Sequence, residues 1–188
     1  IKPKNYLNRK FWDKNRLLDR RVKEKLIEIA DDFIEKLQIK DKVKDITFTG
    51  SLASYNWHKK SDIDLHILVN YEDFDENAEM IKTLMDLERS NWNRIHDILI
   101  KGHEVEIYIQ DEDEEHHANG VYSIKKDEWI VKPSPVATDL DIDGAIKKAE
   151  NLQQDIDLVS DLINTKRLED ALNLADKLKE KIKNLRSA

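Results

Sequence analysis

Three short segments of the chain place oxygen-bearing side chains opposite an apolar face. Residues 45–50, 61–69 and 103–110 alternate polar and apolar side chains, which predicts three half-buried strands. Their oxygen-bearing residues are Thr47, Thr49, Asp62, Asp64, Glu104 and Glu106. Side chains two positions apart on a strand project to the same face, so Asp62 and Asp64 should stand together. If the three strands are neighbours, a glutamate of the third strand joins this pair.

Carboxylates that converge on one face of a sheet favour a cation site. They repel one another unless positive charge lies between them, and hard divalent ions with oxygen ligands, Mg²⁺ or Mn²⁺, suit that environment. Two such ions about 3.5–4 Å apart would stabilise both the attacking and the leaving oxygen of a phosphoryl transfer. The three strands therefore predict a metal-dependent phosphoryl-transfer site.

A phosphate-binding turn precedes these carboxylates. Gly50-Ser51 ends the first predicted strand, and ten residues separate it from Asp62. Glycine permits close approach of the backbone, and a helix start at this point would aim N–H groups at a phosphate. Lys59 and Lys60 could also approach a triphosphate, although lysines on a loop more often serve solubility. A phosphate holder and a metal site thus occur in one motif.

This motif resembles the signature of the DNA polymerase β-like nucleotidyltransferase superfamily. The matching segments are Phe48-Thr49-Gly50-Ser51 and Ser61-Asp62-Ile63-Asp64-Leu65. Val105-Glu106-Ile107 is similar to the third acidic residue of that signature, which lies between apolar neighbours on a later strand. The resemblance covers residues 43–110, and the chain is most similar in size to small nucleotidyltransferases of phages and bacteria.

The resemblance implies a role for each matched residue. Gly50 and Ser51 would hold the β- and γ-phosphates of a nucleoside triphosphate. Asp62 and Asp64 would ligate two divalent metal ions. Glu106 would ligate the ion that activates the acceptor and would help to take the acceptor's proton. The acceptor would attack the α-phosphate in line, and pyrophosphate would leave.

Several residues leave alternatives open. Glu104 rivals Glu106 as the third carboxylate, and Glu106 is preferred because apolar residues flank it on both sides. His66 lies in phase with Asp62 and Asp64, so it could border the site, or a neighbour could simply satisfy it. His116-His117 could bind a transition metal, but a solvated loop is the favoured interpretation. The candidate base-stacking residues are Tyr55, Trp57, Tyr122 and Trp129, for which core packing is the safer interpretation.

The other elements must position this site. Apolar residues at three- and four-residue steps predict one long helix or two short ones over residues 11–39, and a further helix over 75–99. The latter helix is predicted to have an apolar face made of Met80, Leu84, Leu87 and Ile95. A hairpin is predicted within residues 121–131. The expected organisation is an N-terminal helical segment (1–40), a nucleotidyltransferase core (41–132), a linker (133–143) and a helical hairpin packed on the core (144–188).

Composition excludes several classes of protein. The 188 residues suit one domain with a helical appendage, and they contain no Cys, which excludes disulfide scaffolds, zinc fingers, iron–sulfur proteins and thiol enzymes. No apolar run approaches the roughly 18 residues of a spanning helix. No secretory signal is visible, so we expect a cytoplasmic protein without a membrane partner.

Charge is distributed unevenly along the chain. The formal net charge is −7, yet residues 1–25 carry ten Lys and Arg against three Asp and Glu. The acidic balance disfavours a long nucleic acid as partner, and the basic N-terminal arm favours one. The plainer interpretation of the arm is a solvated helix whose cations pair with acidic neighbours.

Taken as a whole, the sequence predicts a mixed α/β (α+β) domain of the polymerase β-like nucleotidyltransferase fold. A small, partly antiparallel sheet would carry helices on one face and the site on the other. The expected activity is metal-dependent transfer of a nucleoside monophosphate from an NTP to a hydroxyl of a nucleic-acid end such as an RNA end, a protein or a small molecule. The alternative is a nucleotide-binding accessory protein that keeps the fold without catalysis.

Overall fold

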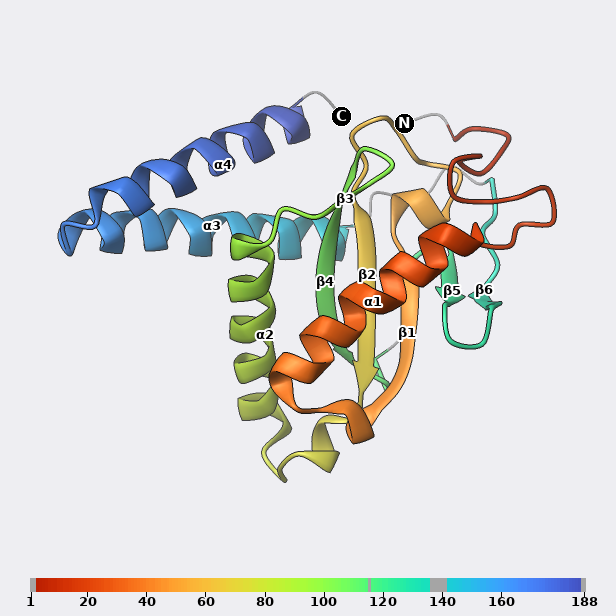
Figure 1. Cartoon of the computed structure of the whole chain (residues 1–188), viewed down its shortest axis with the longest axis horizontal. Coiled ribbons are helices and arrows are strands. Elements are labelled where there is room, and N and C mark those ends of the chain that lie inside the picture. The colour runs from red at the N-terminus through yellow and green to blue at the C-terminus, as the bar shows by residue number, and fades with distance from the viewer. Residues whose placement is uncertain (1–2, 115, 136–141, 187–188) are drawn as a thin grey trace. The chain divides into compact units, whose positions relative to one another are not determined.

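The computed structural model describes residues 3–114, 116–135 and 142–186 (Figure 1). The chain divides into two compact units, Ile1–Thr138 and Asp139–Ala188. The first unit holds the sheet, and the second holds two helices. We describe each unit by itself.

The first unit is built on a six-stranded mixed sheet in the order β3-β4-β2-β1-β5-β6. The strands are β1 (Val43–Thr49), β2 (Ile63–Val69), β3 (Leu99–Ile100), β4 (His103–Asp111), β5 (Val121–Ser123) and β6 (Glu128–Val131). Neighbouring strands are antiparallel except for β2 and β4, which are parallel. The predicted mixed, partly antiparallel sheet is therefore confirmed.

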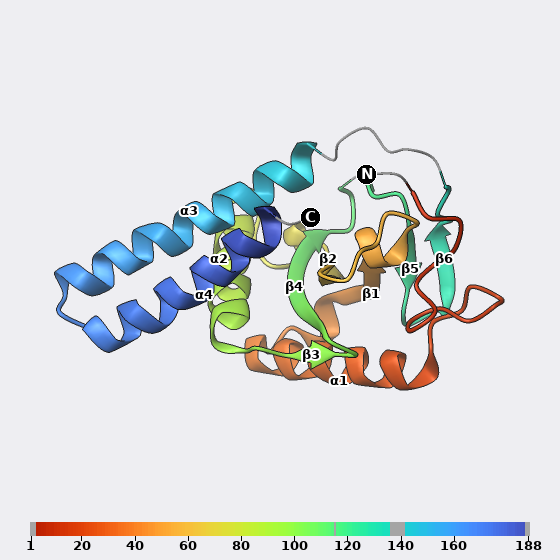
Figure 2. The ribbon, with the colours of Figure 1, turned by 90° about the horizontal axis from the view of Figure 1, so that it is seen from above.

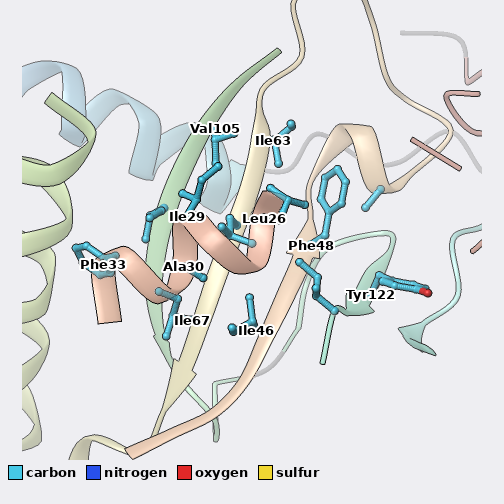
Figure 3. Close-up of a cluster of buried hydrophobic side chains, with 14 of the residues drawn as sticks. Leu26, Ile29, Ala30, Phe33, Ile46, Phe48, Ile63, Ile67, Val105 and Tyr122 are labelled. Atoms are coloured by element: carbon cyan, nitrogen blue, oxygen red, sulfur yellow. The ribbon is translucent and has the colours of Figure 1, made fainter. Parts of the chain in front are cut away.

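One face of this sheet is covered by helix α1 (Arg20–Leu37), as the view along the strands shows (Figure 2). Leu26, Ile29 and Phe33 of α1 pack toward the apolar side chains of β1, β2 and β4 (Figure 3). The residues of these three strands labelled there are Ile46, Phe48, Ile63, Ile67 and Val105. Fully burying such a side chain stabilises the fold by about 1.5–3 kcal/mol. The apolar alternation thus fixes one face of each strand against α1 and leaves the polar residues on the opposite face.

Helix α1 begins later than the sequence suggests. A helix was expected from residue 11, but α1 starts at Arg20, where Asp19 caps it by accepting a hydrogen bond from the Val22 amide at 3.1 Å. Residues 3–18 form an irregular segment instead. Trp12 Nε1 donates to the Leu52 carbonyl at 2.7 Å, a contact between distant parts of the chain that helical periodicity cannot reveal.

Helix α2 (Ala78–Ile95) turns a different face inward from the one expected. Met80, Leu84, Leu87 and Ile95 are between 50% and 61% exposed, so the predicted apolar face is not the buried one. The buried residues are Ile81, Met85, Arg89 and Trp92. The Trp92 ring packs edge-to-face on Phe33, with 5.2 Å between centroids. The helix carries two apolar stripes, and the one that contains the largest ring faces the core.

One side chain of helix α2 also hydrogen-bonds to the backbone of strand β4. Asn93 Nδ2 donates to the Ile107 carbonyl at 2.8 Å, and Asn93 Oδ1 accepts from the Ile107 amide at 2.9 Å. Strand β3 pairs with only the first two residues of β4, so this part of β4 lacks a strand on that side. Asn93 therefore binds both backbone polar groups of Ile107, the residue that follows Glu106.

The second unit is a pair of helices, α3 (Ile142–Asn164) and α4 (Leu168–Arg186), as the sequence predicts. The break lies at Thr165–Arg167, where Lys166 adopts a positive φ of 60°. Leu162, Ala171 and Leu174 form a small buried cluster within the pair. Part of the predicted linker, residues 136–141, lies outside the described residues, and the packing of the pair on the sheet stays a prediction. Within the described ranges, no helix is long and apolar enough to cross a membrane.

Candidate functional site

The Asp64 carboxylate lies directly against the backbone of Gly50. Thr49, the last residue of β1, is the register partner of Asp64 on β2. A Cβ added to Gly50 would overlap Asp64 Oδ2 and lie 2.7 Å from its Cγ. Gly50 also has a φ of 75° and a ψ of −162°, a region that essentially only glycine occupies. The turn after β1 and the aspartate of β2, recognised separately in the sequence, therefore meet.

Glu106 lies level with Asp64 on the neighbouring strand. The parallel register of β2 and β4 pairs Ile63 with Val105 and Asp64 with Glu106. Thr49, Asp64 and Glu106 thus form one row across three strands, on the face opposite the apolar core. Glu104 does not belong to this row, because it pairs with Leu99 of β3. Both Asp64 and Glu106 are half-buried.

Ser61, the residue directly before Asp62, connects Asp62 to Ser51. Ser51 Oγ donates to Ser61 Oγ at 2.7 Å, and Ser61 Oγ also accepts from the His58 amide at 3.0 Å. Asp62 follows Ser61 immediately and is half-buried. Gly50 caps a single 3₁₀ turn, η2 (Ser51–Ala53), rather than a long helix. The ten-residue gap of the motif is therefore a loop folded back onto Ser51.

The start of β4 anchors the same loop. His103 Nδ1 donates to the Ser61 carbonyl at 2.6 Å, and its ring is 4% exposed. The His103 ring also packs edge-to-face on Phe11, with 5.3 Å between centroids. This histidine was not singled out from the sequence, because a residue that follows a glycine at a strand start carries no signal of a contact with a residue 42 positions away. Lys60 is exposed and directly precedes Ser61.

Tyr108 holds the Glu106 carboxylate. Its hydroxyl donates to Glu106 Oε2 at 2.6 Å. Burial, followed by the nearby charges of Glu106 and Asp64, raises the pKa of Tyr108 well above its ordinary value, so the hydroxyl stays protonated as a donor. The Tyr108 ring stacks on His66 at 4.9 Å, and the Arg89 guanidinium lies 5.2 Å from the ring centroid. The tyrosine is thus fixed from both sides.

His66 and Arg89 have further contacts that explain their placement. His66 Nδ1 bonds to Gln110 Oε1 at 2.8 Å, so it is satisfied by a neighbour in the next row of the sheet. Arg89 Nε donates to Asp86 Oδ1 at 2.8 Å, one turn earlier on α2. Arg89 is only 7% exposed, and buried arginines need such partners. The sequence does not point to this arginine, because it occupies a position on the buried stripe of α2 where an apolar residue is expected.

Thr49 has a buried hydroxyl for which the described residues offer no hydrogen-bond partner. Its side chain is 6% exposed, and within the residues that the structure describes Thr49 Oγ1 has no hydrogen-bond partner. Buried polar groups are normally paired, so an orphan of this kind marks a place where a ligand or water is expected. Thr49 occupies the same row as Asp64 and Glu106.

The aromatic candidates divide into core and loop residues. Tyr55 and Tyr122 are buried, and Trp129 packs on Trp12 at 4.6 Å between centroids. Trp57 lies half-buried on the loop between Ser51 and Asp62 and packs against the edge of the core, as the half-buried Trp129 does. Core packing thus accounts for the first three.

The donor set is suited in its chemistry to a hard divalent cation. It consists of carboxylate oxygens from Asp62, Asp64 and Glu106, which Mg²⁺ and Mn²⁺ prefer. In the part of the chain that the structure describes, no three acidic or histidine side chains, including His116 and His117, are gathered closely enough to count as a metal-binding group. The row provides two neighbouring carboxylates, and Asp62 stands two residues before Asp64 along the chain.

Comparison with known families agrees with this geometry. A family model described as "Nucleotidyltransferase domain" matches residues 26–187, which extends well beyond the strands into α1 and both C-terminal helices. No curated protein and no solved structure matches the chain. Because the match covers most of the sequence, the chain belongs to the nucleotidyltransferase domain family.

Proposed function

We propose that this protein transfers a nucleoside monophosphate from an NTP to an acceptor hydroxyl and releases pyrophosphate. The observation that carries the proposal is the packing of the Asp64 carboxylate against Gly50, with Glu106 in the same row. The first contact places a carboxylate beside the backbone of Gly50, a residue without a side chain. The second adds a further carboxylate on the adjacent strand, and adjacent strands lie about 4.8 Å apart.

Each residue of the site has a distinct task in this proposal. Gly50 leaves room for the Asp64 carboxylate against the turn and, with the Ser51 hydroxyl and Lys60, binds the phosphates. Asp62, Asp64 and Glu106 hold Mg²⁺ or Mn²⁺. When bound, the cation neutralises charge on the triphosphate and on these carboxylates. Glu106, oriented by Tyr108, accepts the proton of the acceptor hydroxyl.

Positioning and charge neutralisation supply the catalysis that this reaction needs. Phosphoryl transfer demands little covalent chemistry from the protein, and oriented groups that stabilise developing charge contribute most of the rate. A rigid sheet is well suited to this task, because the row Thr49, Asp64 and Glu106 is fixed by strand register rather than by loops. We infer a cytoplasmic location, where NTPs are available.

A direct experiment is to measure pyrophosphate release from each of the four NTPs with Mg²⁺ or Mn²⁺. The acceptor mixture would contain protein, RNA and small hydroxyl compounds. We expect release that requires the divalent cation and favours one NTP. Release equal to that of a buffer blank in every mixture, with metal-dependent NTP binding retained in calorimetry, would instead favour a non-catalytic nucleotide-binding protein.

That alternative function has one observation in its favour. A nucleotide-binding protein does not need a metal site, and among the described residues no three potential metal ligands are gathered in one place. The row of adjacent carboxylates speaks against it, since a binder of anionic nucleotides gains nothing from clustered negative charge. The pyrophosphate measurement separates the two.

The Tyr108→Phe substitution should lower transfer without unfolding the protein. It removes the hydroxyl that donates to Glu106 Oε2 and keeps the ring between His66 and Arg89. A hydrogen bond to a charged group contributes about 1.5–3 kcal/mol, which corresponds to a loss in kcat/KM of about tenfold or more. The measurement is a set of initial rates with a thermal melt.

A matched control for this variant is Tyr71→Phe. Tyr71 is also buried, but its hydroxyl bonds weakly to the Ile109 carbonyl at 3.4 Å, away from the carboxylate row. We expect its kcat/KM to equal that of the wild type. Equal rates for both phenylalanine variants would show that the Tyr108 hydroxyl does not support the reaction.

The Thr49→Val substitution should stabilise the protein and weaken nucleotide binding. Valine has nearly the shape of threonine and removes a buried hydroxyl that has no partner among the described residues. Relieving an unsatisfied polar group is worth about 1 kcal/mol or more. A bound NTP loses a hydrogen bond in this variant, so the dissociation constant should rise about five- to tenfold.

The control for that experiment is Thr49→Ser, which keeps the hydroxyl and loses the methyl group. It should bind NTP like the wild type and melt at a lower temperature, because a buried methyl group is lost. If Thr49→Val binds NTP as tightly as the wild type, the hydroxyl does not face the nucleotide.

A further inference from the structure

A basic surface adjoins the carboxylate row. Three segments far apart in the sequence, residues 3–12, 52–61 and 101–103, carry six Lys and Arg and no Asp or Glu. The rest of the chain has 26 Lys and Arg against 39 Asp and Glu. We call these three segments the basic surface. Its cations are Lys4, Arg9, Lys10, Lys59, Lys60 and Lys101.

Hydrogen bonds tie the three segments together. The Lys4 amide donates to the Tyr55 carbonyl at 2.7 Å, and Trp57 Nε1 donates to the Tyr6 carbonyl at 3.0 Å. Lys10 Nζ donates to the Lys101 carbonyl at 3.2 Å. These bonds, with those of Trp12 and His103 described above, make the basic surface one continuous part of the fold.

Two segments of the basic surface adjoin residues of the proposed active site along the chain. Residues 52–61 begin directly after Ser51 and end directly before Asp62. Residues 101–103 lead into β4, on which Glu106 follows three residues later. A polyanion on this surface would therefore lie beside the carboxylate row.

Two aromatic rings lie among these cations. The Tyr6 and Trp57 rings meet edge-to-face at 5.7 Å between centroids, and Tyr6 is 44% exposed. Lys4 Nζ lies 4.6 Å from the Trp57 ring, and the Arg9 guanidinium lies 5.3 Å from the Tyr6 ring. Cations interleaved with aromatic side chains are typical of surfaces that bind single-stranded nucleic acid, because phosphates meet the cations and bases stack on the rings.

From these observations we infer that the basic surface binds a single-stranded nucleic acid and brings its end to the carboxylate row as the acceptor. This inference rests on the proposed function for its second part. The oxygen of the strand's terminal hydroxyl bonds to the α-phosphorus of the NTP, the bond from that phosphorus to the oxygen bridging it to the β-phosphate breaks, and pyrophosphate leaves. The hydroxyl proton passes to Glu106.

One local contact limits the charge that is available. Lys101 Nζ lies 3.3 Å from Asp19 Oδ1, so this cation is already paired. Lys60 is assigned to the NTP phosphates, which leaves four cations. Arg9, Lys10 and Lys59 are exposed and Lys4 is half-buried. Neutralising four phosphates of a single strand gives a slope of about −3 in a plot of log affinity against log salt concentration.

The test is fluorescence anisotropy with labelled single-stranded RNA and DNA of about 16 nucleotides, without NTP. We expect binding with a salt slope of about −3. The double variant Arg9→Glu/Lys59→Glu should bind about tenfold or more weakly, with a slope shallower by about 1.4.

The control variant is Lys40→Glu/Lys125→Glu, which changes the net charge equally. Both lysines are exposed and lie at the opposite end of the sheet, before the start of β1 and in the turn after β5. This variant should bind like the wild type. Equal loss of binding in both variants, or binding only to phosphatidylserine vesicles and to neither strand, would overturn the inference.

Binding and transfer can fail separately. Strand binding that depends on Arg9 and Lys59, without transfer, would support the basic surface and contradict the proposed activity. Transfer to a small hydroxyl compound, without strand binding, would contradict the inference and leave the proposed activity standing.

Discussion

The Asp64→Asn variant should lose nucleotidyl transfer and melt at a higher temperature than the wild type. Removing one group that stabilises charge in a transition state typically lowers the rate by about 10²–10³-fold. Stability should rise because Asp64 lies level with Glu106 on the adjacent strand, and two neighbouring carboxylates repel each other when no cation is bound. A gain of about 1 kcal/mol corresponds to about 2–4 °C in melting temperature.

The measurements are transfer rates with Mg²⁺ and thermal melts with and without the metal. Asp62→Asn should lose transfer in the same way. Asp41→Asn is the matched control, because Asp41 is exposed and lies before β1, away from the row. Wild-type turnover in Asp64→Asn would mean that the carboxylate assigned to the metal does not take part in the reaction.

The Gly50→Ala variant should lose both transfer and stability. The added Cβ would overlap Asp64 Oδ2, so the carboxylate must move away from the turn. The backbone at this position, with a φ of 75°, costs a residue with a side chain about 1–3 kcal/mol. We expect the free energy of unfolding to fall by about 2–4 kcal/mol in total, as measured by urea denaturation.

Two companion variants separate strain from overlap. Gly102→Ala has a φ of 86° but nothing within 4 Å of its added Cβ, so it should lose stability and keep transfer. The double variant Gly50→Ala/Asp64→Ala removes the overlapped carboxylate and should regain part of the stability, but no activity. The single variants Gly50→Ala and Asp64→Ala complete the comparison. If the change in the free energy of unfolding of the double variant equals the sum of the changes in these two, Gly50 and Asp64 are not in contact.

Much of this site could be predicted because strand alternation carries its own geometry. The predicted strands 45–50, 61–69 and 103–110 correspond to β1, β2 and β4 with bounds that differ by at most two residues. The phase of the apolar residues then determines which face each acid occupies. Alternation alone therefore predicts that Asp64 and Glu106 lie on the polar face, whatever the register of the strands.

The pairing of those strands could not be read from alternation. The parallel register of β2 with β4 decides that Glu106, and not Glu104, is level with Asp64. The approach of Gly50 to Asp64 is likewise a property of strand pairing, because the two residues lie on different elements.

The errors arose where tertiary contacts outweigh periodicity. Two apolar stripes compete on α2, and only the packing of Trp92 on Phe33 decides which one is buried. The segment before α1 has helical spacing but is held by Trp12 on the Leu52 carbonyl and by the Asp19 cap. The sequence does not point to Tyr108, because only the structure shows that its hydroxyl bonds to the Glu106 side chain two residues earlier.

The most direct test of the central claim is the fate of label from NTPs labelled at the α- or the γ-phosphorus, with Mg²⁺ and the acceptor mixture. We predict that α-label appears on an acceptor while γ-label leaves as pyrophosphate, and that the Asp64→Asn variant does neither. Label from the γ-phosphorus on the acceptor, or α-label transfer that Asp64→Asn retains in full, would contradict the account.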